Sequence, residues 1–567
     1  MPTDMKFKMI PSWLGWILLA SFAVNLVQAG FTPLDPDEAY YWMYSLKPDF
    51  GYFDHPPAVA LFIKAGTWLL PGTAGIRLGT VLLNTITLLI SWILAGRPDD
   101  KRAGILFMAI LLSMPFLQVY AFIATPDAPL LFFSVLYIFI FDRALTTNKT
   151  SWFVLLGVCM AALLYSKYHG LLVILFLLFA HFRLLLNYRF YLAGIIGVLL
   201  FLPHLYWQYI HDFPSFKYHL KGRDDPYELK HTITYIINQL VIFSPLFLPY
   251  TIRAMKQLSA DTVLNKSFRV LIYGFLLFFL YTTFKGHAEP QWTAVLSIPF
   301  SIIVWKYAMT HGVAVQKKVF SLAVVTISIL AIARIVLIIQ PETTGFSLNM
   351  QHKTWVEELK QRANGRPVIF QNSYRNASVY SYYSGEKAYT ITDRDYRKNQ
   401  FDIWDDEKDL FGKKVLIVGN QSMHCDGCEN VRFGLKNFVL ANVDSFQAFG
   451  KIVLMPESDL PALSRNIENP MSIKGYNPYP HAVVIGPGDH SLRISALLYH
   501  KTDLVQEIPL IIPENTILNA QDSFKIEGLI RIPQSVPPGK YDLIMGLGMK
   551  IMPASKNSPK GLAVVVN

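Results

Sequence analysis

Charged residues are scarce in this sequence. Asp, Glu, Lys and Arg make up only 16% of the 567 residues, whereas an ordinary soluble domain carries about 25%. The deficit is confined to the region up to about Gln340, where long apolar runs follow one another; beyond it the chain is dense in Asp, Asn, Lys and Ser. This distribution excludes a single soluble domain and predicts a membrane half followed by a soluble half.

A clustered basic stripe and a cysteine framework are also missing. The net charge is +11, but the basic residues lie in short loops between apolar runs, so no nucleic acid partner is expected. Of the three cysteines, Cys159 lies in an apolar segment and reads as a small buried hydrophobe. Cys425 and Cys428 form a C-x-x-C for which a redox pair, a metal half-site and a disulfide remain open, and an oxidising compartment favours the disulfide.

Apolar runs fill the membrane half. Counting those that supply the roughly 20 residues a spanning helix needs gives about eleven spans. They begin near Ile10, Ala74, Ala103, Ala128, Trp152, Gly170, Phe190, Ile233, Phe268, Trp292 and Val319. The first could instead be a signal peptide, because Val27-Gln28-Ala29 resembles a cleavage site. The residues directly after it look functional, which favours a retained span.

The loop charges predict the orientation. With the N-terminus inside, the inner segments hold most of the Lys and Arg residues of the membrane half, such as Lys101, Arg102, Lys317 and Lys318. An odd number of spans then places everything after about Gln340 outside. We therefore expect a multi-pass protein of the bacterial inner (plasma) membrane, with a cytoplasmic N-terminus and a periplasmic or extracellular C-terminal region.

Ionisable residues gather at the outer ends of the predicted spans. Buried at a membrane surface they cost desolvation energy, which makes them functional candidates. They are Asp35, Asp37, Glu38, Asp54, His55, Asp127, Lys167, Lys285, His287 and Glu289. Each also has a structural explanation, such as a capped interfacial helix for Asp37 or a helix cap for Asp127. Their gathering at one depth predicts a cavity for an anionic lipid headgroup, whose phosphate pairs with Lys or Arg.

Four motifs carry a family resemblance: Asp37–Trp42, Gly51–Pro57, Thr125–Leu130 and Ser166–Tyr168. In this order they resemble the bacterial branch of the protein O-mannosyltransferase-like family. That family belongs to the GT-C superfamily of membrane glycosyltransferases, and lipid A aminoarabinose transferases are relatives. The resemblance covers roughly residues 10 to 340. It implies inverting transfer of a sugar from a polyprenyl-phosphate donor to an envelope acceptor, whether protein, lipid A or another glycan.

The resemblance also implies roles for residues. Asp37 is the expected catalytic base, with Glu38 and Asp127 as supporting acids, because a carboxylate can take the proton of an acceptor hydroxyl. The expected substrate-binding residues are Tyr40, Tyr41, Asp54, His55, Lys167, Tyr168, Lys285, His287, Glu289 and Trp292. Among these, Lys167, Lys285 and His287 are the candidates for phosphate contact. The spacing compels no cofactor, but Asp54, His55, His287 and Glu289 could together bind a divalent metal, and the resemblance leaves this question open.

The competing interpretation is a lipid or solute transporter, or flippase. It predicts ionisable groups within the spans and an internal repeat, whereas the charges lie mostly at the outer ends, with Arg334 as the main exception. For the domains we expect a GT-C-like transmembrane domain at 1–345, an α/β domain at 346–435 and a β-sandwich at 436–567. The soluble region shows no catalytic constellation and is expected to position the acceptor or partners.

Overall fold

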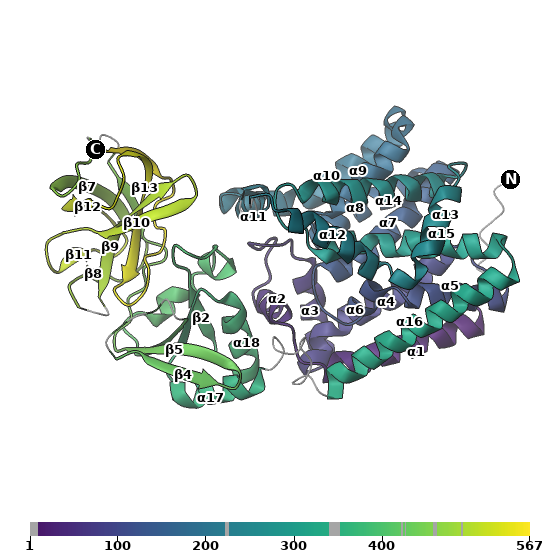
Figure 1. Ribbon diagram of the computed structural model, residues 1–567, viewed down its shortest axis with the longest axis horizontal. Coiled ribbons are helices and arrows are strands. Elements are labelled where there is room, and N and C mark those ends of the chain that lie inside the picture. Colours follow the sequence, from purple (N-terminus) through teal and green to yellow (C-terminus); the bar gives the residue numbers. More distant parts are fainter. Residues whose placement is uncertain are drawn as a thin grey trace. The chain divides into compact units, whose positions relative to one another are not determined.

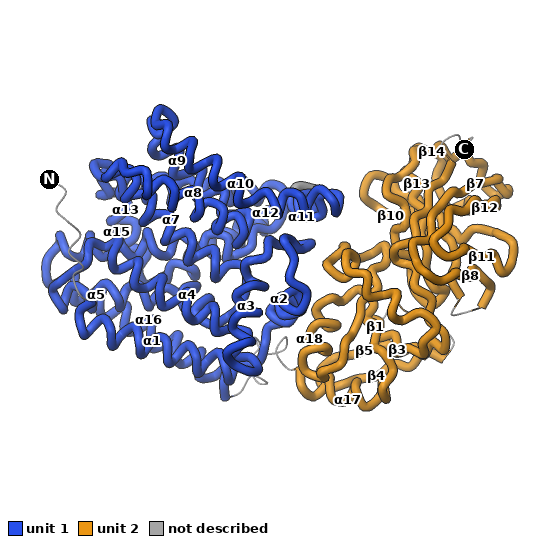
Figure 2. Tube along the Cα trace, turned by 180° about the vertical axis from the view of Figure 1, so that it is seen from behind, with its two compact units in different colours: residues 1–350 blue, residues 351–567 orange. Residues whose placement is uncertain are grey.

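The protein divides into two compact units, residues 1–350 and residues 351–567 (Figure 2). A computed structural model describes residues 10–221, 226–339, 352–420, 423, 425, 427–457, 462–488 and 491–567. The first unit is helical and the second is rich in strands (Figure 1). The expected fold class, a polytopic helical membrane protein with a sheet-rich C-terminal region, is thereby confirmed.

The first unit consists of helices of very different lengths. They are α1 (Ser12–Phe31), α2 (Pro36–Leu46), α3 (Ala58–Leu69), α4 (Gly72–Leu94), α5 (Lys101–Leu112), α6 (Pro115–Val119), α7 (Asp127–Thr147), α8 (Thr150–Ser166), α9 (Gly170–Ala180), η1 (Phe182–Leu186), α10 (Tyr188–Ile210), α11 (Pro214–Lys221), α12 (Leu229–Ile242), η2 (Pro245–Phe247), α13 (Leu248–Gln257), α14 (Val263–Thr282), η3 (Pro290–Leu296), α15 (Ser297–Thr310) and α16 (Val313–Ile339).

Fewer helices qualify as spans than the sequence suggests. Within the described residues, seven are long and apolar enough to cross a membrane, or eight if the bent pair α12 and α13 is one span. The count of eleven is not confirmed. The runs near Ala103, Trp152 and Gly170 form helices of only 12, 17 and 11 residues. A count of apolar residues overestimates their length, because it does not register the prolines and turns at which a helix ends.

The first outer loop folds as two short helices, α2 and α3. A capping box begins α2: the Asp35 side chain accepts from the backbone N–H of Asp37, and the Glu38 carboxylate accepts from that of Asp35. Pro36 occupies the first helical position, where no donor is needed. Trp68 at the end of α3 is 78% exposed, as expected for a helix that lies in the membrane interface.

The interior of the first unit is packed mainly by α4, α5, α7, α8, α14 and α15. By contrast, only 28% of the most apolar stretch of α1 and 11% of that of α16 is buried. These two helices therefore face outward along most of their length. An exposed apolar helix surface of this kind is stable in lipid rather than in water.

The second unit begins with an α/β layer. Its elements are α17 (Lys353–Ala363), β1 (Val368–Gln371), α18 (Tyr374–Ser384), β2 (Ala388–Ile391), η5 (Gln400–Asp402), η6 (Asp406–Leu410), β3 (Val415–Gly419), β4 (Glu429–Phe433) and β5 (Lys436–Val443). The strand order is β2-β1-β3-β5-β4, with β1 parallel to both neighbours and β5 antiparallel to β3 and β4. The sheet therefore continues through Val443, and the expected boundary at 435/436 falls inside the β4–β5 hairpin.

The rest of the second unit forms two further sheets. Their strands are β6 (Val453–Pro456), β7 (Glu468–Asn477), β8 (Val483–Ile485), β9 (Leu492–His500), β10 (Asp503–Pro509), β11 (Thr516–Leu518), β12 (Asp522–Arg531), β13 (Gly539–Met549) and β14 (Leu562–Val566). One sheet runs β11-β8-β9-β13-β14 with β10 beside β9, and the other runs β12-β7-β6. Ile473 and Ile526 of the smaller sheet share one core with Leu498 and Leu543 of the larger, which is a sandwich arrangement.

Candidate active site

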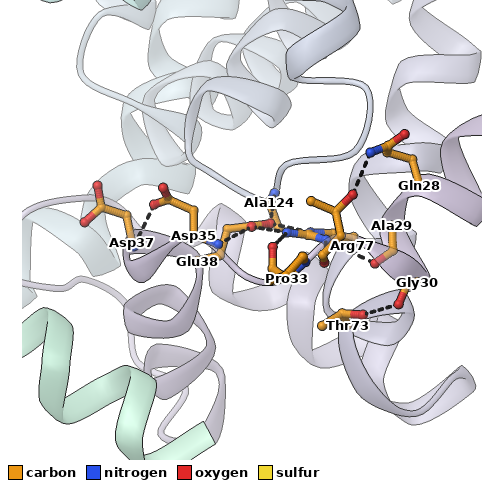
Figure 3. Close-up of polar contacts among 11 residues, drawn as sticks. Gln28, Ala29, Gly30, Pro33, Asp35, Asp37, Glu38, Thr73, Arg77 and Ala124 are labelled. Carbon is orange, nitrogen blue, oxygen red and sulfur yellow. Dashed lines mark hydrogen bonds and ion pairs between the residues drawn. The ribbon is translucent and has the colours of Figure 1, made fainter. Parts of the chain in front are cut away.

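A buried ion pair lies at the end of the helical unit from which α1 leads into α2. The guanidinium of Arg77 on α4 donates to both carboxylate oxygens of Glu38, at 2.7 and 2.5 Å, and both side chains are fully buried (Figure 3). The backbone N–H groups of Asp35 and Ala124 also donate to Glu38, at 3.0 and 2.7 Å. A carboxylate with four donors is satisfied as an anion and has the contacts of a positioning residue.

Arg77 joins three chain segments through its remaining donors. It donates to the carbonyl oxygens of Ala29, Thr32 and Pro33, at 3.1, 2.6 and 2.8 Å. Arg77 thereby ties the end of α1 and the α1–α2 connection to α4, and its partner Glu38 adds the segment before α7 through Ala124. The sequence interpretation missed Arg77, although a lone arginine in an apolar run is itself a signal.

Asp37 takes a different direction from its neighbour Glu38. Its side chain is half-buried and points away from the Arg77 pair, on the side of Asp35 (Figure 3). One step along a helix turns the side chain by about 100°. Two adjacent carboxylates therefore have separate surroundings, and only Glu38 is enclosed in the ion pair. The predicted role of Asp37 as base stays a prediction.

Asp54 binds back to α2. Its carboxylate is 5% exposed and accepts hydrogen bonds from Tyr40 at 3.1 Å and Tyr44 at 3.3 Å. Burial raises the pKa of the Tyr44 phenol, and nearby Tyr40 and Asp54 add to the effect. The ring of Tyr41 lies 5.8 Å from that of His55. Four predicted substrate-binding residues, Tyr40, Tyr41, Asp54 and His55, thus lie together around the first outer loop.

The segment from Asp49 to Asp54 is held by α10 and α11. Each contact joins a side chain of those helices to this segment. The pairs are His204 Nδ1 with Phe50 O at 2.7 Å, Trp207 Nε1 with Asp49 Oδ2 at 2.8 Å, Ser215 Oγ with Tyr52 O at 3.0 Å and His219 Nε2 with Asp54 O at 3.0 Å. The loop that carries Asp54 is therefore fixed against the helices rather than lying free over them.

Tyr168 is bound into the same network. A carbonyl oxygen only accepts, so His204 Nδ1 donates to Phe50 and His204 Nε2 must accept from the Tyr168 hydroxyl, 2.9 Å away. Gln208 donates to the same hydroxyl oxygen at 3.1 Å. Burial raises the pKa of Tyr168, and the charge of Asp54 adds to the shift. Because its hydroxyl proton is already committed, Tyr168 offers its ring rather than a donor to a ligand.

A second buried ion pair joins α7 to the α8–α9 connection. The ammonium of Lys167 lies 2.7 and 2.9 Å from the two carboxylate oxygens of Asp127, and each residue is 5% exposed. Asp127 is the first residue of α7, where the helix dipole also favours a negative charge. The two residues predicted to act at the site are thus direct partners.

A cavity of about 290 Å³ opens beside this pair. The residues that line it include cationic, imidazole and aromatic groups: Lys167, Tyr168, His169, His219, Phe278, Phe279, Lys285, His287 and Trp292. Five of the predicted substrate-binding residues, namely Lys167, Tyr168, Lys285, His287 and Trp292, share its wall. Glu289 lies next to the cavity, with its carboxylate 3.9 Å from His287 Nε2. Lysines, imidazoles and apolar rings in one cavity suit a phosphate attached to a lipid chain.

Tyr120 connects the acidic residues. Burial raises the pKa of its phenol, and the carboxylates of Asp127, Asp35 and Glu289 raise it further, in that order. These carboxylates come from the starts of α7, α2 and η3, so their fields overlap at Tyr120. The sequence interpretation missed Tyr120, since a single tyrosine after a short apolar run carries no distinguishing signal.

The proposed metal ligands do not come together. Within the described part of the chain, no group of three or more His, Cys, Asp or Glu side chains is placed to hold a metal ion. Asp54 and His55 lie in the first outer loop, whereas His287 and Glu289 lie between α14 and η3. In the part of the chain that the structure describes, these four residues therefore do not form a divalent metal site.

The fold of the chain is similar to that of solved membrane proteins. ArnT from Cupriavidus metallidurans in the apo state matches with a TM-score of 0.56 and 14% sequence identity, covering 76% of this chain and 98% of that chain. The same protein bound to undecaprenyl phosphate matches with a TM-score of 0.57 at the same identity and coverage. The chain thus shares its fold with ArnT, and the resemblance expected from the sequence is confirmed at the level of the fold.

A family model matches part of the sequence. Residues 54–207 match the model described as dolichyl-phosphate-mannose-protein mannosyltransferase. Among curated proteins, none matches the sequence. The matched segment runs from Asp54 to Trp207 and includes Asp127, Lys167 and Tyr168.

Proposed function

We propose that the protein transfers a sugar from a polyprenyl-phosphate donor to an acceptor of the cell envelope at the outer face of the membrane. The observation that carries the proposal is the cavity in which Lys167, Lys285 and His287 share one wall with Trp292 and Phe279. Cations beside aromatic rings accommodate a phosphate and the first isoprene units that follow it. The ArnT complex contains undecaprenyl phosphate, a ligand of this chemistry.

The chemistry needs a base and a stabilised leaving group. The acceptor hydroxyl oxygen attacks the anomeric carbon and forms the new C–O bond, while the bond from that carbon to the phosphate oxygen breaks. Its proton passes to the carboxylate of Asp37. The electron pair leaves with the polyprenyl phosphate, whose charge Lys285, His287 and Lys167 stabilise. Attack opposite the leaving group inverts the anomeric centre.

The carboxylates have different tasks in this scheme. Asp127 holds Lys167 in the cavity wall, and Glu38 holds α2 through Arg77, so both act by position. Asp37, outside both pairs, remains the candidate base. Tyr40, Tyr41, Asp54 and His55, which contact one another in the first outer loop, are assigned to the acceptor, and Glu289 is assigned to orient His287. The acceptor is a protein, lipid A or another envelope glycan, and the second unit positions it.

A disulfide in the second unit supports the proposed periplasmic or extracellular location of that unit. Cys425 and Cys428 are joined in a disulfide, as the sequence favoured, and disulfides persist in oxidising compartments. Together with the positive charge of the inner loops, this supports an inner-membrane protein whose second unit is periplasmic or extracellular.

The test uses the purified full-length chain and a radiolabelled polyprenyl-phosphate sugar. Wild type should release polyprenyl phosphate by transfer or slow hydrolysis, and Asp37→Asn should lower the rate by a factor of 100 or more. Cys425→Ser, which changes a residue of the second unit outside the proposed chemistry, should retain it. Lipid or solute uptake that survives Asp37→Asn in a protein without transfer activity would support a transporter and refute the proposal.

A further inference from the structure

A polar cavity lies inside the second unit, where the α/β layer meets the sandwich. It runs along the edge strand β2, and η5, η6, the segment before β6 and the β13–β14 connection complete its wall. Its volume is about 60 Å³, room for about five water molecules, so it can take one small ring but not a chain. Junctions between domains are preferred places for ligand sites.

Hydrogen bonds across this junction hold the wall in place. Ser555 Oγ donates to the carbonyl oxygen of Thr392 at 2.7 Å. The backbone N–H groups of Phe449 and Gly450 donate to the Glu407 carboxylate at 2.8 and 3.2 Å. The cavity is therefore preformed, which lowers the entropic cost of binding a ligand.

Asp402 and Lys451 in this wall retain hydrogen-bonding capacity. Asp402 Oδ2 accepts from the Asn399 N–H at 2.7 Å and from Thr392 Oγ1 at 3.0 Å, whereas no residue in the described part of the chain donates to Oδ1. The Lys451 ammonium donates to the carbonyl oxygens of Ile403, at 3.0 Å, and of Asp402, which uses two of its three N–H groups. One acceptor and one donor thus remain close together.

The charges of the wall are of both signs. Four carboxylates line the cavity together with the ammonium groups of Lys398, Lys451 and Lys556. Burial raises the pKa of Asp402 and of Glu407 and lowers the pKa of Lys451. The carboxylates repel an anionic ligand, whereas an alcohol hydroxyl donates to a carboxylate and accepts from an ammonium at the same time. The wall therefore suits a neutral ligand with several hydroxyl groups.

Three aromatic rings add a flat apolar surface to the wall: Tyr389, Tyr396 and Phe401. Aromatic side chains present a broad apolar face beside a polar edge. A pyranose ring has the matching shape, with hydroxyl groups around its edge and C–H groups on its face.

We propose that this cavity binds one neutral sugar residue of an envelope glycan. A sugar hydroxyl donates to Asp402 Oδ1 and accepts from Lys451 Nζ, while the C–H face of the ring packs against Phe401. The site is separate from the donor cavity of the first unit, which is the one that Lys167 and Lys285 line. Only the identity of this glycan as the acceptor rests on the proposed function; the binding itself does not.

The experiment measures binding by saturation-transfer NMR of the full-length chain in detergent. The probes are the methyl glycosides of mannose, glucose, galactose and N-acetylglucosamine, with inorganic phosphate as the anionic competitor. Wild type should bind at least one glycoside. Lys451→Met should weaken this binding about tenfold, the loss of one hydrogen bond to a charged group. Phe401→Leu, which stays apolar but loses the ring, should weaken it severalfold.

Lys540→Met is the matched control, because Lys540 is an exposed lysine of β13 in the same unit and does not line the cavity. It should bind the glycoside as wild type does. Phe401→Leu keeps the test open if Lys451→Met fails to fold. Binding of no glycoside, equal binding in wild type and both cavity variants, or displacement of the sugar by inorganic phosphate would overturn the proposal. No donor lipid is present, so failure of the sugar-transfer test leaves this outcome unaffected.

Discussion

Lys167 binds Asp127 through both carboxylate oxygens, at 2.7 and 2.9 Å, and it does so in the wall of the donor cavity. The ammonium that is proposed to stabilise a lipid phosphate is therefore already neutralised before a ligand arrives. An incoming phosphate has to share Lys167 with Asp127. In the proposed function, Asp127 therefore sets the strength of phosphate binding as well as the position of the lysine.

This sharing predicts opposite effects of two substitutions on affinity for polyprenyl phosphate. Asp127→Asn removes the competing charge and should tighten binding severalfold, whereas Lys167→Gln should weaken it about tenfold, the loss of one charge-assisted hydrogen bond. Both should lower sugar transfer, because the leaving phosphate is no longer released or stabilised correctly. Isothermal calorimetry in detergent measures the affinity; weaker binding in both variants would contradict the sharing.

The Glu38–Arg77 pair predicts a non-additive pattern of stability. Glu38→Gln or Arg77→Gln leaves a buried charge without its partner and should each lower the unfolding free energy by about 3–5 kcal/mol. The double substitution Glu38→Gln with Arg77→Met should recover part of that loss, since no uncompensated charge remains. Thermal unfolding of the full chain in detergent reports the pattern. Additive losses would show that the pair is not coupled.

The close approach of the first outer loop to α10 at Gly51 predicts that a larger residue at this position disturbs the loop. A Cβ there would lie 2.5 Å from Trp207 Cε3 and 2.9 Å from His204 Nδ1. Gly51→Ala should therefore shift the loop that carries Asp54, cost about 1–3 kcal/mol of stability and lower transfer activity. Gly194→Ala on α10 is the control, because no atom lies within 4 Å of the position of an added Cβ. Equal activity in both variants would count against a positioning role for the loop.

Lys436 predicts a pH dependence in the second unit. Its ammonium donates to Asn376 at 2.7 Å above the ring of Trp355, and burial lowers its pKa from 10.5 to about 8. The unfolded chain therefore binds more protons between pH 8 and 10.5, so the stability of this unit should rise with pH in that interval, by an amount of the order of 1 kcal/mol. Below pH 8 the full cost of the buried charge is present.

Hydrogen exchange of the peptides from 427–443, corrected for the chemical effect of pH, measures this change in the full-length chain. Lys436→Met has no titrating group and should show a flat profile between pH 8 and 10.5. A rise of the same size in Lys436→Met would assign the effect to another residue.

Much of this site was predictable from the sequence because the signals are local. Long apolar runs identify the membrane half, and the places of Asp37, Asp127 and Lys167 at the ends of those runs indicate residues near a membrane surface. The C-x-x-C and the strand-rich second unit were also readable. The number of spans was not, because apolar composition does not reveal that α12 and α13 are bent by 82° or that α9 is only 11 residues long.

The sequence by itself determined which segments are stable in lipid and which in water. It also determined at which end of the helical unit the ionisable groups collect. Both follow from the composition along the chain. Tertiary structure alone decided which charge meets which. Arg77 finds Glu38 across 39 positions and Lys167 finds Asp127 across 40. Buried charges are stable only beside a partner in space, and helix packing brings those partners together.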